Sequence, residues 1–240
     1  ATALSDADAL IENLEELIAK KRNIKHGVMQ ELLTGEKRLA GFNGKWGTIR
    51  IGEVADIFKG NGLSKIKLNP EGKYKCILYG ELFTTYKHII EDVVSHTDFN
   101  EGLYSKVGDI LIPGSTTTIG IDLAIASTVL EDNILLGGDI NVIRPKKASI
   151  NSIFLAYYIA ETMKHKISEL TQGITIIHLY GKDLKTLEIK IPEISEQDAI
   201  AKILVDIDEE ISGLEKHMNK YKLIKQGMMQ ALLTGKIRLV

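Results

Sequence analysis

The chain has 240 residues, with 30 lysines and arginines against 32 aspartates and glutamates, so its formal net charge is −2. A hydrophobic fraction of 44% and a charged fraction of 26% exclude a disordered or collagen-like chain. The single cysteine, Cys76, excludes an internal disulfide and a thiolate metal cluster, and it fits a reducing cytoplasm. The sequence has no run of about 18 apolar residues that would span a membrane. The near-neutral charge argues against bulk electrostatic binding to nucleic acid, but it leaves a local basic face open.

The two ends of the chain carry two copies of one sequence element. Gapless alignment of residues 1–39 with residues 201–239 gives 19 identities in 39 positions, at an offset of 200. The repeat predicts three regions: a helical copy at 1–39, a unique domain at 40–195 and a second helical copy at 196–240.

Each copy has the periodicity of a helix with one apolar seam. Apolar residues recur at alternating spacings of four and three, which is typical of a coiled coil. The pattern then shifts to Ile24, Val28 and Leu32 in the first copy and to Ile224, Met228 and Leu232 in the second. Pro192 and the run Ser-Glu-Gln-Asp at 195–198 predict a capped start of the second helix. The predicted seam residues are Ile11, Leu14, Ile18, Ile207, Ile211, Leu214 and Met218.

Charge is distributed unevenly along both copies. Acidic residues gather in the first half of each copy and basic residues in the second half, an arrangement that also suits the helix dipole. In an antiparallel pair each acidic half faces a basic half, whereas in a parallel pair like charges face each other. We therefore predict an antiparallel helix pair; the alternative is that each helix only packs against the middle domain.

The middle of the chain alternates short apolar segments with glycine and asparagine turns. These segments predict strands at 46–60, 74–79, 109–112, 121–128, 139–144 and 187–191. Residues 150–170 have the period of a helix. The fold class is therefore α+β, with a strand-rich globular domain and a long antiparallel two-helix coiled coil formed by the terminal helices.

Three polar loops, at 79–88, 113–120 and 172–178, combine hydroxyl, amide, lysine and aromatic side chains. These are the groups that position phosphates and read base edges. Surface loops of many proteins are equally polar, so the loops alone do not distinguish a DNA-reading domain.

Several motifs, in their order along the chain, resemble the specificity subunit of type I restriction-modification systems. Leu-Tyr-Gly-Glu-Leu at 78–82 and Gly-Asp-Ile-Leu-Ile at 108–112 resemble segments of its target-recognition domain. Gly-Ile-Thr-Ile-Ile-His-Leu at 173–179 resembles the exit from that domain, and Gly-Val-Met-Gln-Glu-Leu-Leu-Thr-Gly at 27–35, with its copy at 227–235, resembles the end of the spacer helices. The resemblance covers essentially the whole chain.

The resemblance implies a DNA-recognition subunit without a catalytic site. Each recognition domain would read one half of a bipartite double-stranded DNA target, and the helices would dock modification (methyltransferase) subunits. Those partners would bind S-adenosylmethionine, and restriction (motor-nuclease) subunits would join them in the cytoplasm. The chain itself would need no cofactor or metal. The predicted DNA contacts are Lys59, Lys65, Lys67, Tyr79, Thr84, Thr85, Tyr86, Lys87, Ser115, Thr116, Thr117, Thr118, Gln172, Thr175 and His178.

Four alternatives stay open at this point. Tyr86 either stacks on a base or closes the core, and His178 is either a base contact or a histidine of the loop or core. Family members usually have two recognition domains, and this chain begins without Met inside a helix, so it is either half of a longer subunit or a natural half that forms a homodimer. The rival function is a coiled-coil scaffold that binds proteins and not DNA.

Overall fold

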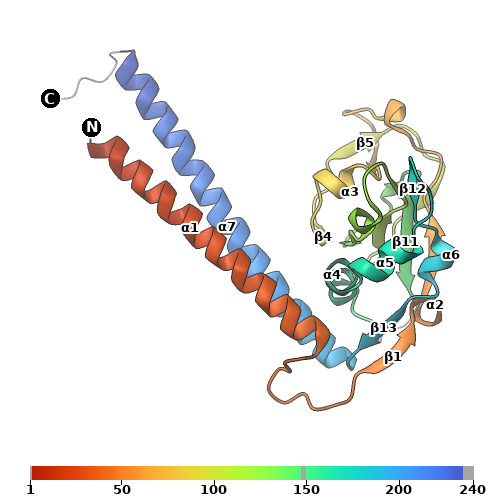
Figure 1. Cartoon of the computed structure of the whole chain (residues 1–240). Coiled ribbons are helices and arrows are strands. Elements are labelled where there is room, and N and C mark those ends of the chain that lie inside the picture. The colour runs from red at the N-terminus through yellow and green to blue at the C-terminus, as the bar shows by residue number, and fades with distance from the viewer. Residues whose placement is uncertain (1, 147–149, 235–240) are drawn as a thin grey trace. The chain divides into compact units, whose positions relative to one another are not determined.

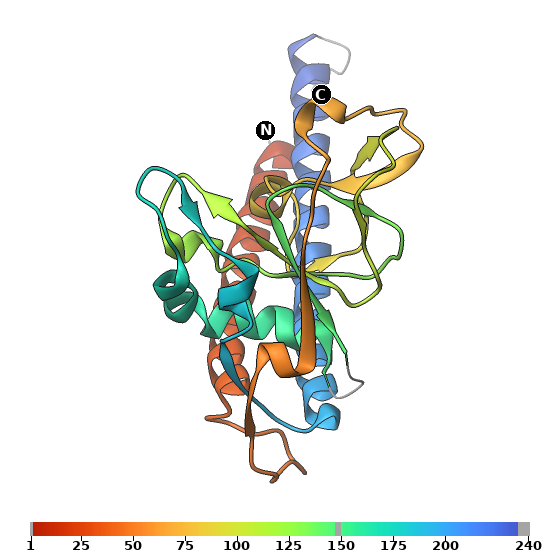
Figure 2. The same ribbon diagram turned by 90° about the vertical axis from the view of Figure 1, so that its right-hand side faces the viewer.

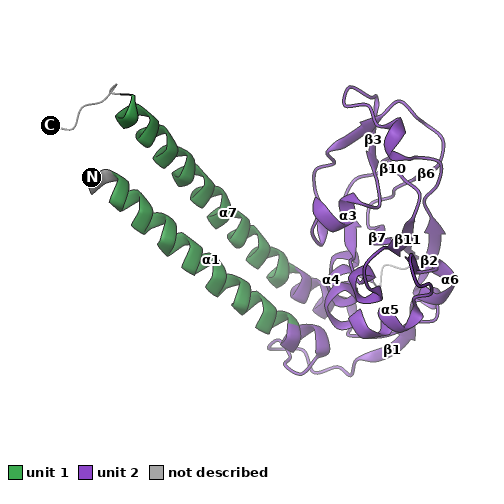
Figure 3. Ribbon diagram, turned by 45° about the horizontal axis from the view of Figure 1, so that its top comes forward, with its two compact units in different colours: residues 1–29, 202–240 green, residues 30–201 purple. Residues whose placement is uncertain are grey.

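The computed structural model describes residues 2–146 and 150–234. Two compact units are present: Ala1–Met29 together with Lys202–Val240, and the segment Gln30–Ala201 (Figure 3). We refer to the first as the helix pair and to the second as the globular unit. Their helices and strands carry the labels of Figure 1.

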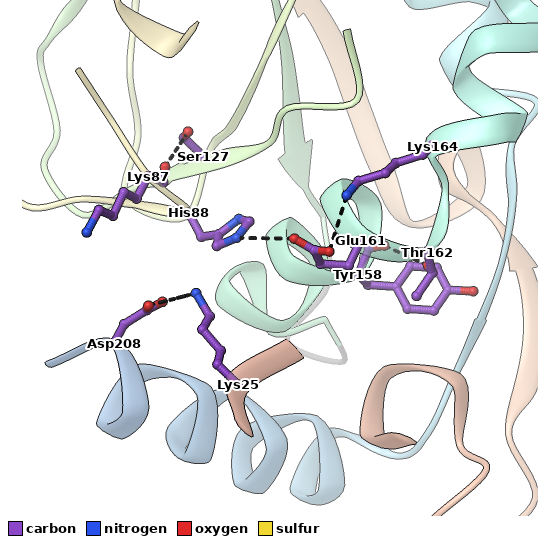
Figure 4. Close-up of polar contacts among 9 residues, drawn as sticks. All are labelled: Lys25, Lys87, His88, Ser127, Tyr158, Glu161, Thr162, Lys164 and Asp208. Atoms are coloured by element: carbon purple, nitrogen blue, oxygen red, sulfur yellow. Dashed lines mark hydrogen bonds and ion pairs between the residues drawn. The ribbon is translucent and has the colours of Figure 1, made fainter. Parts of the chain in front are cut away.

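The helix pair is formed by the two long terminal helices, α1 (Thr2–Thr34) and α7 (Ile194–Leu233). They run side by side in opposite directions (Figures 1 and 3), which confirms the antiparallel prediction. Lys25 and Asp208, for example, approach to 2.7 Å (Figure 4). The ion pairs that join the helices are Lys21–Glu210, Arg22–Glu215, Lys25–Asp208, Lys222–Glu15 and Lys225–Asp8.

The repeat gives the helix pair an approximate internal two-fold symmetry. Each residue of one copy has its equivalent 200 positions away in the other copy. A contact between α1 and α7 is therefore repeated by the contact between the two equivalent residues. The ion pairs related in this way are Lys25–Asp208 with Lys225–Asp8, and Arg22–Glu215 with Lys222–Glu15. Exposed pairs contribute at most about 1 kcal/mol each, so their main effect is to fix the register and direction of the helices.

The predicted seam lies on the inward side of both helices. Ile11, Ile18 and Ile211 are buried. The half-buried seam residues are Leu14, Ile207, Leu214 and Met218. An apolar row at a spacing of 3.5 residues stays on one side of an α-helix, so the heptad pattern explains this burial.

The predicted shift of the apolar pattern is confirmed at Val28, Leu32, Met228 and Leu232, which are half-buried or buried. It is wrong at its first position in each helix, Ile24 and Ile224. These side chains are 45% and 43% exposed. The half-buried positions are instead those of Lys25 and Lys225, which form ion pairs with carboxylates of the facing helix. A lysine can lie over apolar surface with its aliphatic stem while its ammonium group reaches a carboxylate at the edge.

The start of α7 also differs from the prediction, because the helix begins at Ile194 and the expected capping run at 195–198 lies within its first turns. Glu196 and Gln197 from this run are buried. The Arg38 guanidinium donates two hydrogen bonds to the Glu196 carboxylate, at 2.5 and 2.6 Å. The Gln197 amide donates to the Pro192 carbonyl at 2.9 Å. These side chains therefore fix the beginning of the helix through tertiary contacts.

Two larger sheets and two short strand pairs form the globular unit. The five-stranded sheet has the order β2 (Ala55–Lys59), β11 (Ile140–Pro145), β7 (Ile110–Pro113), β9 (Ser127–Val129) and β4 (Ile89–Ile90). The four-stranded sheet has the order β5 (Ser95–Thr97), β3 (Tyr74–Ile77), β10 (Leu135–Leu136) and β6 (Leu103–Tyr104). The short pairs join β1 (Gly47–Arg50) to β13 (Glu188–Ile191) and β8 (Ser115–Thr116) to β12 (Ile177–His178).

The predicted helix at 150–170 is present as two helices, α4 (Ser152–Thr162) and α5 (Lys164–Leu170), which meet at Met163. The Asn151 side chain caps α4 by accepting a hydrogen bond from the Phe154 backbone N–H at 2.8 Å. The middle of α4 is buried on all sides, since all seven consecutive residues from Phe154 to Ala160 are buried. Its apolar sequence is therefore typical of a core helix.

Two predicted strands are partly helical. The segment 46–60 contains a turn of helix, α2 (Ile51–Val54), between β1 and β2, and the segment 121–128 begins with the 3-10 helix η2 (Gly120–Leu123). Ile51 and Val54 are both buried, as are Gly120 and Leu123. Side chains three residues apart lie on one side of a helical turn, whereas a strand sends them to opposite faces. The remaining elements are η1 (Lys65–Lys67), α3 (Glu81–Thr84) and α6 (Gly181–Leu184).

Cys76 lies in the core of the four-stranded sheet and is completely buried. Burial raises the pKa of its thiol to about 11. At pH 8 about one molecule in a thousand then carries the reactive thiolate. We expect the native protein not to react with Ellman's reagent at this pH, and to release one equivalent of chromophore after unfolding in guanidinium chloride. Rapid reaction of the native protein would contradict this position of Cys76.

Candidate nucleic-acid interface

An open cleft of about 740 Å³ lies on the globular unit where β2 ends and α3 begins. It brings together four of the predicted DNA contacts, although they come from three separate segments of the chain. These residues are Lys59, Lys65, Tyr79 and Thr84. The cleft carries ammonium, phenol and hydroxyl groups on a lining that also includes Leu63, Leu68 and Leu78, so it suits a ligand with both polar and apolar planar surfaces.

The motif Leu-Tyr-Gly-Glu-Leu at 78–82 builds one wall of this cleft. The Glu81 carboxylate accepts a hydrogen bond from the Leu78 backbone N–H at 2.6 Å, and it also accepts one from the Ser95 hydroxyl. The turn before α3 is thereby folded back on itself, and Leu82 is buried beneath it. Tyr79 is consequently held at the exposed bend. In this structure the glutamate of the motif shapes the turn, and the tyrosine faces the cleft.

Asp139, which the sequence did not single out, connects the cleft to a neighbouring loop. It lines the cleft, forms an ion pair with Lys59 at 3.1 Å, and accepts a hydrogen bond from the Ser115 hydroxyl at 2.9 Å. Burial raises the pKa of the Asp139 carboxyl, but the hydrogen bonds from Lys59 and Ser115 outweigh this effect and the pKa lies below its ordinary value. Asp139 is therefore charged at neutral pH and positions both partners.

Two of the predicted loops, 113–120 and 172–178, pair with each other although more than 50 residues separate them. Strand β8 lies beside β12 and pairs with it antiparallel (Figure 2). In this pairing Thr116 is opposite Ile177 and Ser115 is opposite His178. Gln172 forms a further antiparallel bridge with His178. We refer to the paired segments 115–118 and 172–178 as the ribbon. Because Ser115 contacts Asp139, the ribbon and the cleft are adjacent.

Hydroxyl groups of the ribbon are partly engaged within the chain. The Thr116 and Thr118 hydroxyls are 2.8 Å apart, and the Thr118 hydroxyl donates to Asp122 at 2.5 Å. The Ser115 hydroxyl is buried against Asp139. Thr117, Gln172 and Thr175 are exposed, and the His178 ring stacks on Tyr180 with centroids 5.9 Å apart. The exposed groups of the ribbon therefore include hydroxyl and amide side chains.

The other predicted contacts do not line the cleft or the ribbon. Lys67 lies over the Phe99 ring at 3.3 Å and donates to a backbone carbonyl. Thr85 and Lys87 are exposed, and the Lys87 carbonyl accepts a hydrogen bond from Ser127 (Figure 4).

Tyr86 is half-buried against the core. Its hydroxyl accepts a hydrogen bond from the Val94 backbone N–H at 3.3 Å, and burial raises its pKa to about 12. Of the two alternatives for Tyr86, the packing favours closure of the core. DNA contact by each of the predicted residues stays a prediction.

The part of the chain that the structure describes forms neither a metal-ligand cluster nor a membrane-spanning helix. Within residues 2–146 and 150–234, no group of three or more His, Cys, Asp or Glu side chains is arranged to hold a metal ion. In the same part of the chain no helix has both the length and the apolar character to cross a membrane. The arrangement is that of a strand-rich domain with an open cleft beside a polar ribbon, whose chain enters and leaves through two copies of one helix.

This arrangement has a known counterpart. Residues 43–225 match the family model described as the type I restriction modification DNA specificity domain. The chain belongs to this family.

Two curated relatives come from Methanocaldococcus jannaschii. One is named the putative type I restriction enzyme MjaX specificity subunit; it is 27% identical over 257 residues, which cover 99% of this chain and 56% of the relative. The other is named the type I restriction enzyme MjaVIII specificity subunit; it is 28% identical over 261 residues, which cover 99% of this chain and 59% of the relative. The chain thus spans slightly more than half the length of these relatives.

Solved structures show the same fold. The HsdS subunit from Thermoanaerobacter tengcongensis superposes with a TM-score of 0.56 at 19% identity, covering 95% of this chain and 56% of that one. The S subunit of a type I restriction-modification system from M. genitalium superposes with a TM-score of 0.62 at 16% identity, covering 94% and 57%. These matches agree with an α+β domain joined to an antiparallel coiled coil.

Proposed function

We propose that this chain is a non-catalytic DNA-recognition subunit that reads one half of a bipartite target in a type I restriction-modification complex. The observation that carries the proposal is the ribbon beside the cleft. Two polar loops of the sequence pair as strands, and Asp139 connects them to Lys59 of the cleft. Lysines neutralise phosphates, while hydroxyl and amide groups reach base edges in the grooves.

Partners follow from the family and from the surface of α1. Leu10, Leu17 and Ile24 recur every seven residues and form an exposed apolar row apart from the buried seam. We propose that this row docks the modification subunits, which bind S-adenosylmethionine and methylate DNA in the cytoplasm, and that restriction subunits join the same complex. An amphipathic surface of a partner subunit would cover the row, since isolated apolar heptads on a helix favour association.

The second half of the target requires a second reading domain. We propose that it comes from the remainder of a longer subunit, with a homodimer of this chain as the alternative. The approximate two-fold symmetry of the helix pair supports both, because either copy of the repeat presents the same charges to a facing helix.

The salt dependence of DNA binding tests the proposal. The chain, assembled with its modification subunit, is titrated against a target duplex located by methylome sequencing, at salt concentrations from about 50 to 300 mM. We expect log K to fall linearly with log salt, and Lys59→Ala or Lys65→Ala to reduce the slope by about one each, since each removes one phosphate contact.

Lys106→Ala is the matched control. Lys106 is exposed and precedes β7, whereas the ribbon follows β7. Lys106 and the ribbon therefore lie at opposite ends of this strand. This variant should keep the slope of the wild type. Absence of duplex binding by the assembled wild-type complex would overturn the proposal in favour of a protein scaffold.

A further inference from the structure

The most exposed apolar side chain of the globular unit lies at the end of the ribbon. Ile174 is 98% exposed, and Ile176, two residues later, is 48% exposed. Ile119, which follows the hydroxyl residues of the neighbouring loop, is 61% exposed. Single exposed apolar residues are common on protein surfaces, but three exposed isoleucines on two loops that pair with each other indicate a binding surface.

The turn that carries Ile174 is fixed by backbone geometry. Gln172 and His178 exchange two backbone hydrogen bonds, of 2.9 and 2.7 Å. Gly173 has a φ of +124°, and a Cβ atom there would lie 2.0 Å from the Ile176 carbonyl oxygen. Only glycine therefore fits at this position, and the tight turn presents Ile174 to solvent.

The register of the ribbon places the three isoleucines beyond the same end. Thr116 is opposite Ile177 in an antiparallel pair. Ile119 follows Thr116 in the sequence and Ile174 and Ile176 precede Ile177, so all three lie on the same side of this residue pair. Polar groups thus lie along the ribbon, and apolar groups lie at its end. Within residues 2–146 and 150–234 nothing covers Ile174, so an external surface with apolar character would fit it.

We infer that Ile174 is an apolar wedge that inserts between two adjacent base pairs of the target duplex and unstacks them, with Ile119 and Ile176 against the groove at either side. This inference rests on the proposed DNA-recognition function. Aliphatic side chains on a rigid projection partly unstack base steps in other DNA-binding proteins, and pyrimidine–purine steps deform most readily. The ribbon carries predicted DNA contacts directly behind the wedge, so duplex DNA is the partner that the surroundings favour.

The test follows base stacking in the complex of the full chain with its modification subunit. Target duplexes carry 2-aminopurine at successive positions, because its fluorescence rises when it loses a stacked neighbour. For the wild type we expect a rise at one step inside the half-site. Ile174→Ala should abolish that rise and weaken binding roughly tenfold, by the loss of buried aliphatic surface, while the salt slope stays unchanged. Ile174→Leu should retain both properties.

Val107→Ala is the matched control, because Val107 is also exposed and apolar but precedes β7, at the strand end remote from the ribbon. It should change neither fluorescence nor affinity. Since Ile174 is almost fully exposed, its variants should keep the wild-type melting temperature.

The outcomes separate this inference from the proposed function. Salt-dependent duplex binding without any Ile174-dependent rise in fluorescence would overturn the wedge and leave DNA recognition intact. Loss of assembly with the modification subunit in Ile174→Ala, with the fluorescence pattern preserved, would assign the isoleucines to a protein contact and overturn the wedge as well. Absence of duplex binding by the wild-type complex would overturn both.

Discussion

Replacing Arg144 by methionine should lower the melting temperature of the globular unit by about 6–12 °C. The Arg144 guanidinium donates to both oxygens of the completely buried Asp109 carboxylate, at 2.7 and 2.6 Å, and also to the Tyr104 carbonyl at 3.0 Å. Removing one partner of a buried pair leaves an uncompensated charge, which costs about 3 kcal/mol or more. For a protein of this size each kcal/mol corresponds to about 2–4 °C.

The motif Gly-Asp-Ile-Leu-Ile at 108–112 explains why this pair matters. Gly108 has a φ of +87°, which turns the chain into β7. Asp109 then accepts a hydrogen bond from the Lys106 backbone N–H at 2.8 Å as well as those of Arg144. The three apolar residues that follow are completely buried. The motif is therefore a structural element that anchors the central strand of the five-stranded sheet.

Arg50→Met is the control for Arg144→Met. Arg50 also faces an acidic residue, Glu188, but at 3.4 Å with both side chains more than half exposed, so its loss should be nearly neutral. Combining Arg144→Met with Asp109→Asn should cost less than the sum of the single variants, since the second change removes the stranded charge. Two results would contradict a tightly coupled buried pair: additive losses of stability in the double variant, or a fall in melting temperature of less than about 2 °C for Arg144→Met.

Aspartate in place of Ile18 or Ile211 should separate the two long helices and abolish assembly with the modification subunit. Both isoleucines are buried in the seam, so the new carboxylate would be withdrawn from water among apolar side chains. Burying an unpaired charge is costly enough to open a two-helix contact. Amide hydrogen exchange along α1 and α7 should become fast, while exchange in the five-stranded sheet stays slow because it belongs to the other compact unit.

Leu17→Asp separates the seam from the proposed docking row. Leu17 lies next to Ile18 in sequence but is 39% exposed. The variant should keep slow exchange in both helices and still lose the modification subunit. If Ile211→Asp assembles normally, the seam is not needed for docking; if Leu17→Asp assembles normally, the partner contacts another face of the helices.

Part of the candidate interface can be predicted from the sequence, and part cannot. Lys59, Lys65, Tyr79 and Thr84 were selected for their chemistry and lie together at the cleft. Asp139 was missed because an acidic residue in a glycine turn gives no signal of DNA contact, and its role depends on Lys59 and Ser115 being brought to it. Tyr86 was selected for its aromatic ring, which the fold turns against the core.

The sequence by itself determined the repeat, the antiparallel direction of the helices and the strands at β3, β7, β11 and β13, because heptads, charge halves and apolar runs are local patterns. Only the tertiary structure decided that α7 begins at Ile194, that helical turns replace strand at α2 and η2, and that the ribbon forms from two distant loops. These features depend on contacts between residues far apart in the chain, such as Arg38 with Glu196 and Ser115 with Asp139. Local periodicity carries no information about such contacts, whereas the packed core and its hydrogen bonds select them.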